Sequence, residues 1–205
     1  QDPSPSGLFF KDDGTKMYII GTNNDMVHQY SLSQAWNLST ATYDNVNFSI
    51  ASQDGSSTGI FFNSTGTKMY IVGDSNNRVH QYTLSSAWNL STATYDNVNL
   101  SVASEDDQPH DIFFNSSGTR MYMVGQSGDR INQFTLSSSW NLSTASSDNV
   151  NFNQKSEDST PTGLFFNSSG TRMYIVGSAG DLVHQYTLSQ AWNLSTATYD
   201  NVNLS

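Results

Sequence analysis

The chain has 205 residues, no cysteine, and a formal net charge of −10 from 18 acidic and eight basic residues. The absence of thiols excludes a disulfide framework and a thiolate metal site. The negative charge is the wrong sign for binding nucleic acid or an anionic membrane surface, and no apolar stretch is long enough to insert into a membrane. The chain begins with Gln1 rather than Met, so we expect a processed protein or part of a longer one.

One unit of 52 residues occurs four times along the chain without a gap. The segment Gly-Leu-Phe-Phe at 7–10 recurs in closely similar form at 59–62, 111–114 and 163–166. Self-similarity at a fixed period of this length is typical of repeat folds such as propellers and solenoids. We therefore predict a single repeat domain, 1–205, made of four units at 1–52, 53–104, 105–156 and 157–205.

Within each unit, four strands are predicted in chain order, as the second unit shows. Apolar runs at 59–62 and 69–73 flank a turn at 63–66, and a third run follows at 79–84. A longer connection containing Trp88 leads to a fourth run at about 98–102. Tight turns favour residues that tolerate positive φ, and pairs such as Asn76-Asn77 lie between the second and third runs.

These patterns predict an all-β fold, a β-propeller with four four-stranded blades. The first two runs are apolar on both faces, which a sheet sandwiched between two copies of itself requires. The four blades could close as a ring, form half of an eight-bladed ring, or belong to a longer array. A β-solenoid or a string of small β-domains is the alternative architecture.

The segment 163–177, Gly-Leu-Phe-Phe-Asn-Ser-Ser-Gly-Thr-Arg-Met-Tyr-Ile-Val-Gly, resembles the first half of the YVTN/lactonase-like propeller repeat. The shared features are a small first residue, an apolar strand, a Gly-Thr turn and a second strand containing Tyr. The resemblance covers all four units and implies a propeller. That group includes lactonases, surface-layer proteins and binding proteins, and the resemblance carries no catalytic residue onto this chain.

The charges are expected to divide between the two ends of the blades. Twelve of the 18 acidic residues but only three of the eight basic ones fall in the connections before the first strand and between the second and third strands. Such a face would attract cations or a basic partner, and calcium is conceivable as a ligand although no cofactor is predicted. Solvated acidic turns that keep a β protein soluble are the alternative.

Asn-x-Ser/Thr sequons recur at the opposite end and predict a glycoprotein that is extracellular or on the cell surface. A chain so rich in Asn, Ser and Thr would also produce sequons by chance. The candidate glycosylation sites are Asn37, Asn47, Asn63, Asn89, Asn99, Asn115, Asn141, Asn167, Asn193 and Asn203.

Two repeated aromatic patterns are candidate binding sites. His28, His80 and His184 occupy equivalent third-strand positions, where a structural role is favoured over metal ligation, and no metal site is predicted. His110 is the one histidine outside the repeat pattern, beside several aspartates. One tryptophan per unit could stack on a sugar ring, although anchoring of the long connection is the favoured role. These candidate stacking residues are Trp36, Trp88, Trp140 and Trp192.

The blades are so similar that each brings the same residues to equivalent places, whereas an active site needs unlike residues that converge. No catalytic motif is present, so no catalytic residue is predicted. The sequence therefore favours a non-enzymatic extracellular structural or adhesive protein that associates with itself or with other surface proteins. A lectin-like propeller with one carbohydrate site per blade is the first alternative, and a lactonase-type enzyme is the second.

Overall fold

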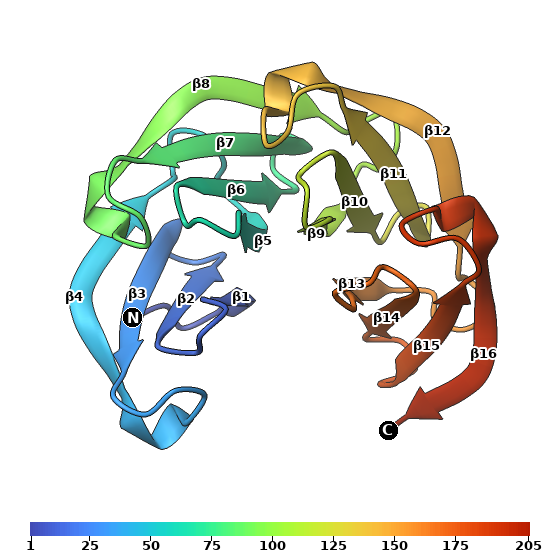
Figure 1. The fold of residues 1–205 in the computed structure, drawn as a ribbon, viewed down its shortest axis with the longest axis horizontal. Helices are drawn as coiled ribbons and strands as arrows, with labels where there is room; N and C mark the ends of the chain where they lie inside the picture. The colour runs from blue at the N-terminus through green and yellow to red at the C-terminus, as the bar shows by residue number, and fades with distance from the viewer. The chain divides into compact units, whose positions relative to one another are not determined.

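The protein is all-β and consists of four four-stranded antiparallel sheets of the propeller type, as the repeat predicted (Figure 1). The computed structural model describes all residues from 1 to 205. In each sheet the strands lie side by side in chain order, and each sheet falls within one predicted unit. The chain forms two compact units, Gln1–Asn99 and Leu100–Ser205.

The first two sheets contain β1 (Pro5–Phe10), β2 (Lys16–Gly21), β3 (Met26–Leu32) and β4 (Ala41–Ser49), then β5 (Ser57–Phe62), β6 (Lys68–Gly73), β7 (Arg78–Leu84) and β8 (Ala93–Ser101). The last two contain β9 (Pro109–Phe114), β10 (Arg120–Gly125), β11 (Arg130–Leu136) and β12 (Ala145–Asn153), then β13 (Pro161–Phe166), β14 (Arg172–Gly177), β15 (Val183–Leu188) and β16 (Ala197–Leu204). Short 3-10 helices precede the fourth strands: η1 (Leu38–Thr40), η2 (Leu90–Thr92), η3 (Leu142–Thr144) and η4 (Leu194–Thr196).

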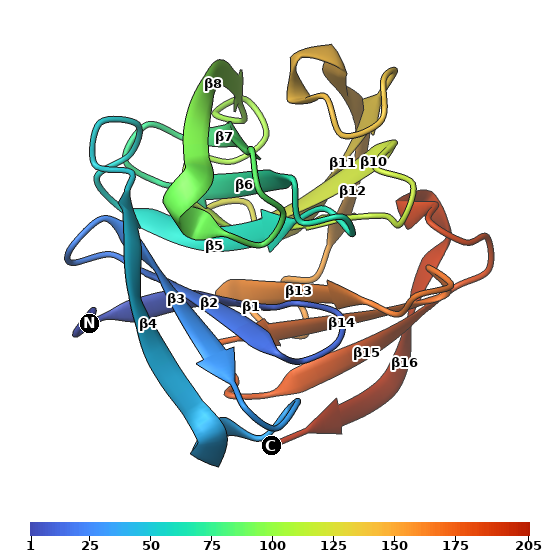
Figure 2. The ribbon, with the colours of Figure 1, turned by 60° about the vertical axis from the view of Figure 1, so that its left-hand side comes forward.

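The fourth strand of each sheet is longer than the first three. Figure 2 shows β4 at the edge of its sheet, and it has nine residues against six in β1. The sequence predicted only the second half of this strand. The strand continues through a register shift opposite Gln29 and Tyr30, near which Asn45 adopts a φ of 56°. This irregularity lets a polar segment pair along the whole length of β3.

Apolar side chains fill the space between neighbouring sheets. In the first unit, Tyr18, Ile20 and Val27 from the first sheet pack against Ile60 and Ile71 from the second. Tyr122, Val124 and Ile131 meet Leu164 and Ile175 in the same way in the second unit. Burial of both faces explains why the first two strands of each repeat lack the alternation of a half-exposed strand.

The long connection in each repeat is anchored by its tryptophan. The indole of Trp88 lies over Gly66, whose φ is +68°, and the backbone N–H of Trp88 donates to the Gly66 carbonyl at 2.9 Å. The ring also contacts Phe62 and, in the preceding sheet, Phe9 and Tyr18. This arrangement supports the favoured structural interpretation of the repeated tryptophan.

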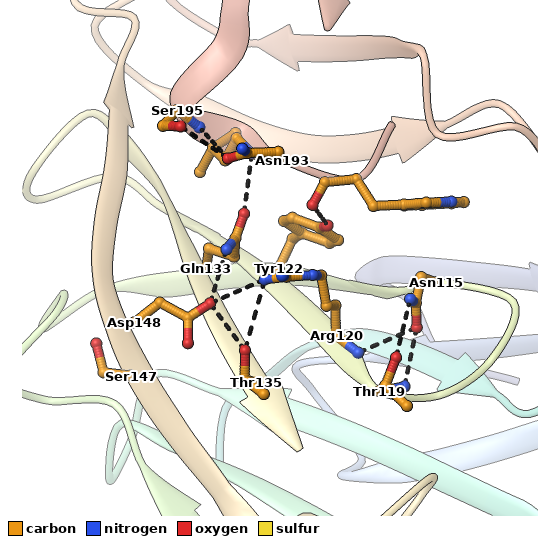
Figure 3. Close-up of polar contacts among 12 residues, drawn as sticks. Asn115, Thr119, Arg120, Tyr122, Gln133, Thr135, Ser147, Asp148, Asn193 and Ser195 are labelled. Carbon is orange, nitrogen blue, oxygen red and sulfur yellow. Dashed lines mark hydrogen bonds and ion pairs between the residues drawn. The ribbon is translucent and has the colours of Figure 1, made fainter. Parts of the chain in front are cut away.

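Two hydrogen bonds connect the sheets of each unit through the segment after the tryptophan. In the second unit, the Tyr122 hydroxyl donates to the Trp192 carbonyl at 2.6 Å. The Leu194 N–H donates to Gln133 Oε1 at 2.9 Å. Figure 3 shows Gln133 between this segment and Asp148, to which its Nε2 donates at 2.7 Å. Tyr18 and Gln29 make the same bonds to Trp88 and Leu90 in the first unit.

An aspartate on the fourth strand collects the polar groups of each sheet. Asp96 Oδ2 accepts from Gln81 Nε2 at 2.7 Å, from Lys68 Nζ at 2.8 Å and from the Thr83 hydroxyl at 2.9 Å. Burial alone would raise the pKa of Asp96, but these hydrogen bonds and the Lys68 charge outweigh it and hold the pKa below its usual value. The carboxylate therefore stabilises the fold.

Asp96→Ala is expected to lower the free energy of unfolding by about 1–3 kcal/mol, because three donors lose their acceptor. The folded-state pKa is depressed, so the contribution is fully present above about pH 4 and is lost as the pH falls further. Urea unfolding at pH 7 and pH 3 measures the difference. Asp12→Asn, in an exposed turn, serves as the control, and an equal effect of both substitutions would contradict the prediction.

Candidate functional site

The third repeat differs from the other three at one point on its first strand. β9 pairs with β10 through Pro109–Gly125 and then Asp111–Val124, so His110 is the extra residue of a β-bulge. The same bulge occurs in the other sheets, with Ser6, Thr58 and Thr162 at this position. A glycine follows each of those hydroxyl residues at 7, 59 and 163. The third repeat thus replaces a hydroxyl residue and a glycine with His110-Asp111.

In the other repeats the bulge hydroxyl has a structural role. Ser6 Oγ donates to the Ser57 carbonyl at 2.8 Å, and Thr58 Oγ1 donates to the Val72 carbonyl at 3.3 Å. Bulges re-aim side chains and are over-represented next to active sites. His110 and Asp111 therefore place two titratable groups where the other repeats have a hydroxyl residue that donates to backbone carbonyls and a glycine.

The carboxylate of Asp111 lies between β9 and β13, the first strands of two neighbouring sheets. Its Oδ1 accepts from the Ile112 N–H at 2.8 Å and its Oδ2 from the Leu164 N–H at 3.0 Å. Gly163, next to Leu164, lies near the carboxylate, since a Cβ added there would be 4.0 Å from Oδ2 and 2.8 Å from Cγ1 of Val176. Each oxygen keeps a lone pair for a further partner.

Burial raises the pKa of Asp111 to about 7, although the two backbone hydrogen bonds act in the opposite direction. At neutral pH the group therefore exists in both its protonated and ionised forms. A carboxyl group in this state can accept a proton from water and return it to a leaving group. Perturbed carboxyl groups of this kind concentrate at functional sites.

The sequence patterns do not predict this site. In the sequence, Asp111 is one of the twelve acidic residues assigned to the acidic face. His110 is the histidine outside the repeat pattern, and no role is predicted for it. A signal is nevertheless present when the four units are aligned, because the glycine at 7, 59 and 163 is replaced by aspartate at 111. Its meaning depended on the Leu164 N–H, 53 residues away, which only the fold brings to the carboxylate.

Several aspartates of the acidic face bind the backbone. Asp106 accepts from the N–H groups of Gln108 at 2.8 Å and Gly128 at 2.8 Å, so it ties two connections together. Asp158 makes the equivalent bonds to Thr160 and Gly180. These carboxylates serve as structural acceptors for backbone N–H groups of the connections.

The candidate glycosylation sites fall into three groups. Asn63, Asn115 and Asn167 close the first turn of their repeats, and Asn63 Oδ1 accepts two backbone N–H groups. Asn37, Asn89, Asn141 and Asn193 cap the 3-10 helices. Asn47, Asn99 and Asn203 are exposed on fourth strands, where each donates to a tyrosine hydroxyl. The third group is the most accessible, and glycosylation stays a prediction.

The repeated histidines and tryptophans lie in packed surroundings. His28, His80 and His184 are buried, each edge-on to a tyrosine of the fourth strand. Burial lowers the pKa of His80 to about 4, and the nearby Arg78 adds to the effect. Among the tryptophans, Trp36 is exposed, and carbohydrate stacking stays a prediction.

Comparison with protein-family models found no match, and neither did comparison with curated proteins. Solved structures do match. A Bacteroides uniformis protein provisionally named a 6-phosphogluconolactonase superposes with a TM-score of 0.65 at 13% identity, over 98% of this chain and 54% of its own. The periplasmic gluconolactonase PpgL of Pseudomonas aeruginosa gives 0.58 at 10% identity, over 97% and 52%. A chain of the nidogen/laminin complex gives 0.55 at 15%, over 92% and 62%.

These similarities confirm the resemblance to lactonase-like propellers at the level of the fold. The chain spans about half the length of the two lactonases. The lactonases contradict the expectation of a non-enzymatic structural or adhesive protein, which was wrong. That expectation assumed that near-identical blades cannot form an asymmetric site, but the residues His110-Asp111 at the shared bulge differ from those of the other repeats.

Proposed function

We propose that the chain carries part of the active site of a lactone hydrolase, with Asp111 as general base. The observation that carries the proposal is the Asp111 carboxyl group, whose pKa is about 7, at a position where the other three repeats have glycine. Its burial is unfavourable for folding at neutral pH. A costly residue at a single place in a repeat is typical of function.

In this reaction, a water molecule attacks the carbonyl carbon of the lactone while Asp111 accepts a proton from that water. The ring C–O bond of the tetrahedral intermediate then breaks, and the protonated Asp111 returns the proton to the departing alkoxide oxygen. The product is the open-chain hydroxy acid. Asp111 ends in its ionised form, so atoms and charge balance over the cycle.

The charge of the chain favours a neutral lactone over a phosphorylated one. With a net charge of −10, a carboxylate at the site and few basic residues, the chain lacks the cationic groups that a phosphoester needs. We therefore propose an uncharged sugar lactone as substrate. An exported location is part of the proposal, and PpgL is a periplasmic protein. No helix in the chain is long and apolar enough to cross a membrane.

Asp111→Asn is expected to lower kcat/KM for glucono-1,5-lactone by roughly 100-fold or more, the usual contribution of a general base. For the parent chain, kcat/KM should rise with pH and level off above the Asp111 pKa of about 7. Hydrolysis is followed by proton release in a pH-stat, with the spontaneous rate subtracted. The phosphorylated lactone is measured alongside and is expected to react more slowly.

Asp12→Asn is the matched control, because it removes the same charge from an exposed turn. It should leave the rate within about twofold. A parent chain that is no faster than the spontaneous reaction, or an Asp111→Asn variant that keeps the full rate, would refute the proposal.

A further inference from the structure

Each unit contains a fully buried tyrosine whose hydroxyl has no hydrogen-bond partner in the chain. Tyr82 on β7 and Tyr186 on β15 are both 0% exposed, and their Oη atoms are unbonded. The equivalent Tyr30 of the first sheet donates from its hydroxyl to Gln1 Oε1 at 3.3 Å. A buried hydroxyl without a partner is costly, and most such groups in folded proteins bind protein or ordered water. The two hydroxyls therefore need a partner that the chain itself does not supply.

A second buried residue departs from the repeat in each unit, and both departures add a polar atom. Ser57 begins β5, whereas the other three repeats have proline at the equivalent positions 5, 109 and 161. Gln154 lies in the connection before β13, where the connections before β5 and β9 have Ile50 and Val102. Ser57 and Gln154 are both 0% exposed, and Ser57 Oγ and Gln154 Oε1 have no partner. Each unit thus buries two unbonded polar groups.

The third repeat lacks both the hydroxyl and the polar neighbour. Its third strand has Phe134 in place of the tyrosine, and the two other positions are occupied by Val102 and Pro109. All three of these residues are buried. A buried polar residue therefore accompanies the tyrosine at Tyr82 and Tyr186 and is missing where the tyrosine becomes phenylalanine. This correspondence indicates that the hydroxyl and its polar neighbour act together.

In the first unit, the strand register places Ser57 beside the carboxylate of Asp54. Ser57 pairs directly with Gly73, so the Cβ directions of the two residues point to the same face of the sheet, about 4.5–5.5 Å apart. A Cβ added to Gly73 would lie 2.4 Å from Cγ of Asp54, so the carboxylate covers this glycine. Asp54 is itself only 2% exposed. The Ser57 hydroxyl and the Asp54 carboxylate therefore share one small buried region.

Tyr82 approaches the same region from β7. It pairs with Met69, which lies two alternations from Gly73 on β6, so its side chain is on the same face of the sheet as Ser57. On this face its ring is edge-on to Phe48 of the first sheet. Burial raises the pKa of Tyr82, and the charges of Tyr95 and Asp54 add to the effect. The Tyr82 hydroxyl therefore lies near the carboxylate that borders Ser57.

The second unit places Gln154 and Tyr186 around Asp158 in the same way. Gln154 Nε2 donates to the Asp158 carbonyl at 3.1 Å, which leaves Oε1 as an acceptor. Burial raises the pKa of Tyr186, and the charges of nearby groups, Glu157 and Asp158 among them, add to the effect. In the first unit, Ile50 at the position of Gln154 packs in one cluster with Tyr82. The amide oxygen therefore takes the place of an apolar group that neighbours the tyrosine.

We propose that each unit binds one ordered water molecule at its buried tyrosine. In the first unit, the Tyr82 hydroxyl donates to the water, which donates to Ser57 Oγ and to the Asp54 carboxylate. In the second unit, the Tyr186 hydroxyl donates to the water, which donates to Gln154 Oε1. Buried waters typically make about three hydrogen bonds to groups that are otherwise unsatisfied, and the first site offers three such groups. The proposal is independent of the hydrolase activity.

A high-resolution crystal structure of the full chain tests the two water sites directly. We expect an isolated peak of electron density about 2.6–3.2 Å from both Tyr82 Oη and Ser57 Oγ. A second peak is expected at the same distances from Tyr186 Oη and Gln154 Oε1. A direct hydrogen bond between the two side chains of a site, or no density between them, would overturn the proposal.

Thermal unfolding tests whether the two side chains of the first site share one partner. Tyr82→Phe and Ser57→Ala should each lower the melting temperature by roughly 2–5 °C, because each removes one hydrogen bond from the water and its remaining partners. The double variant should lower it by clearly less than the sum of the two shifts, because the second substitution removes a group that has already lost its full set of bonds.

Ser57→Ala combined with Tyr186→Phe is the matched control, because these two residues belong to different water sites. Their shifts in melting temperature should add. Unchanged near-UV circular dichroism shows that each variant is folded, and Phe134 shows that the repeat accepts phenylalanine at the tyrosine position. If the shifts of Tyr82→Phe and Ser57→Ala add as fully as those of the control pair, the two groups do not share a water molecule and the proposal fails.

Discussion

Gly66→Ala is expected to lower the free energy of unfolding by about 2–4 kcal/mol, from a left-handed backbone strain of about 1 kcal/mol and the cost of overpacking. Gly66 has a φ of +68°, and a Cβ on it would lie 2.2 Å from Cδ2 of the Trp88 indole. The ring cannot simply move away, because the backbone N–H of Trp88 is bound to the Gly66 carbonyl, which holds the two residues together, and the indole packs against Phe62.

Urea unfolding at pH 7 measures this effect, with Gly55→Ala as the matched control. Gly55 has no positive φ, and the nearest atom to an added Cβ is the Ser75 hydroxyl at 3.9 Å. The control should change stability by less than about 0.5 kcal/mol. Equal effects at the two glycines would show that the tryptophan does not hold the turn.

Asp111→Asn is expected to change the free energy of unfolding in a pH-dependent way. Relative to the parent chain, the variant should be about 3–4 kcal/mol more stable at pH 8 than it is at pH 4.5. The pKa of Asp111 is about 7 in the folded chain and about 4 when unfolded. A folded-state pKa above the unfolded value means that the folded protein binds the proton more tightly. Stability from this group is therefore greatest below pH 4, falls as the pH rises to 7, and is level above.

Urea unfolding of parent and variant at pH 4.5, 6 and 8 isolates this term, because the other acidic residues are common to both proteins. Any loss from an imperfect hydrogen bond of the substituted amide is nearly independent of pH and cancels in the difference. Asp12→Asn, in an exposed turn, is unfolded alongside as the control substitution. A stability difference for Asp111→Asn that is the same at all three pH values would contradict the raised pKa.

Together, the two Asp111 experiments separate function from folding. A purely structural carboxylate would lose stability on substitution and have no effect on lactone hydrolysis. The proposed base should gain stability at pH 8 and lose activity in the same variant. Such a trade-off between stability and activity is common for active-site residues.

Much of the fold could be predicted from the sequence by itself. The 52-residue period determined four sheets, and the apolar runs at 69–73 and 79–84 correspond closely to β6 and β7. These predictions succeed because hydrophobic periodicity and turn residues act over a few positions. The first half of the fourth strand was missed because its polar residues pair through a register shift that local patterns do not reveal.

The tertiary structure decided which residues of this protein differ in role despite their identical sequence surroundings. Leu38 and Leu90 lie in the same local sequence, yet Leu38 is exposed whereas Leu90 is buried in a cluster with Tyr18 and Val27 of the preceding sheet. Asp111 likewise became a candidate base only in the fold, where the Leu164 N–H of β13 donates to its carboxylate and burial raises its pKa. Desolvation and cross-sheet hydrogen bonds join residues that are distant in the chain, so no local pattern contains them.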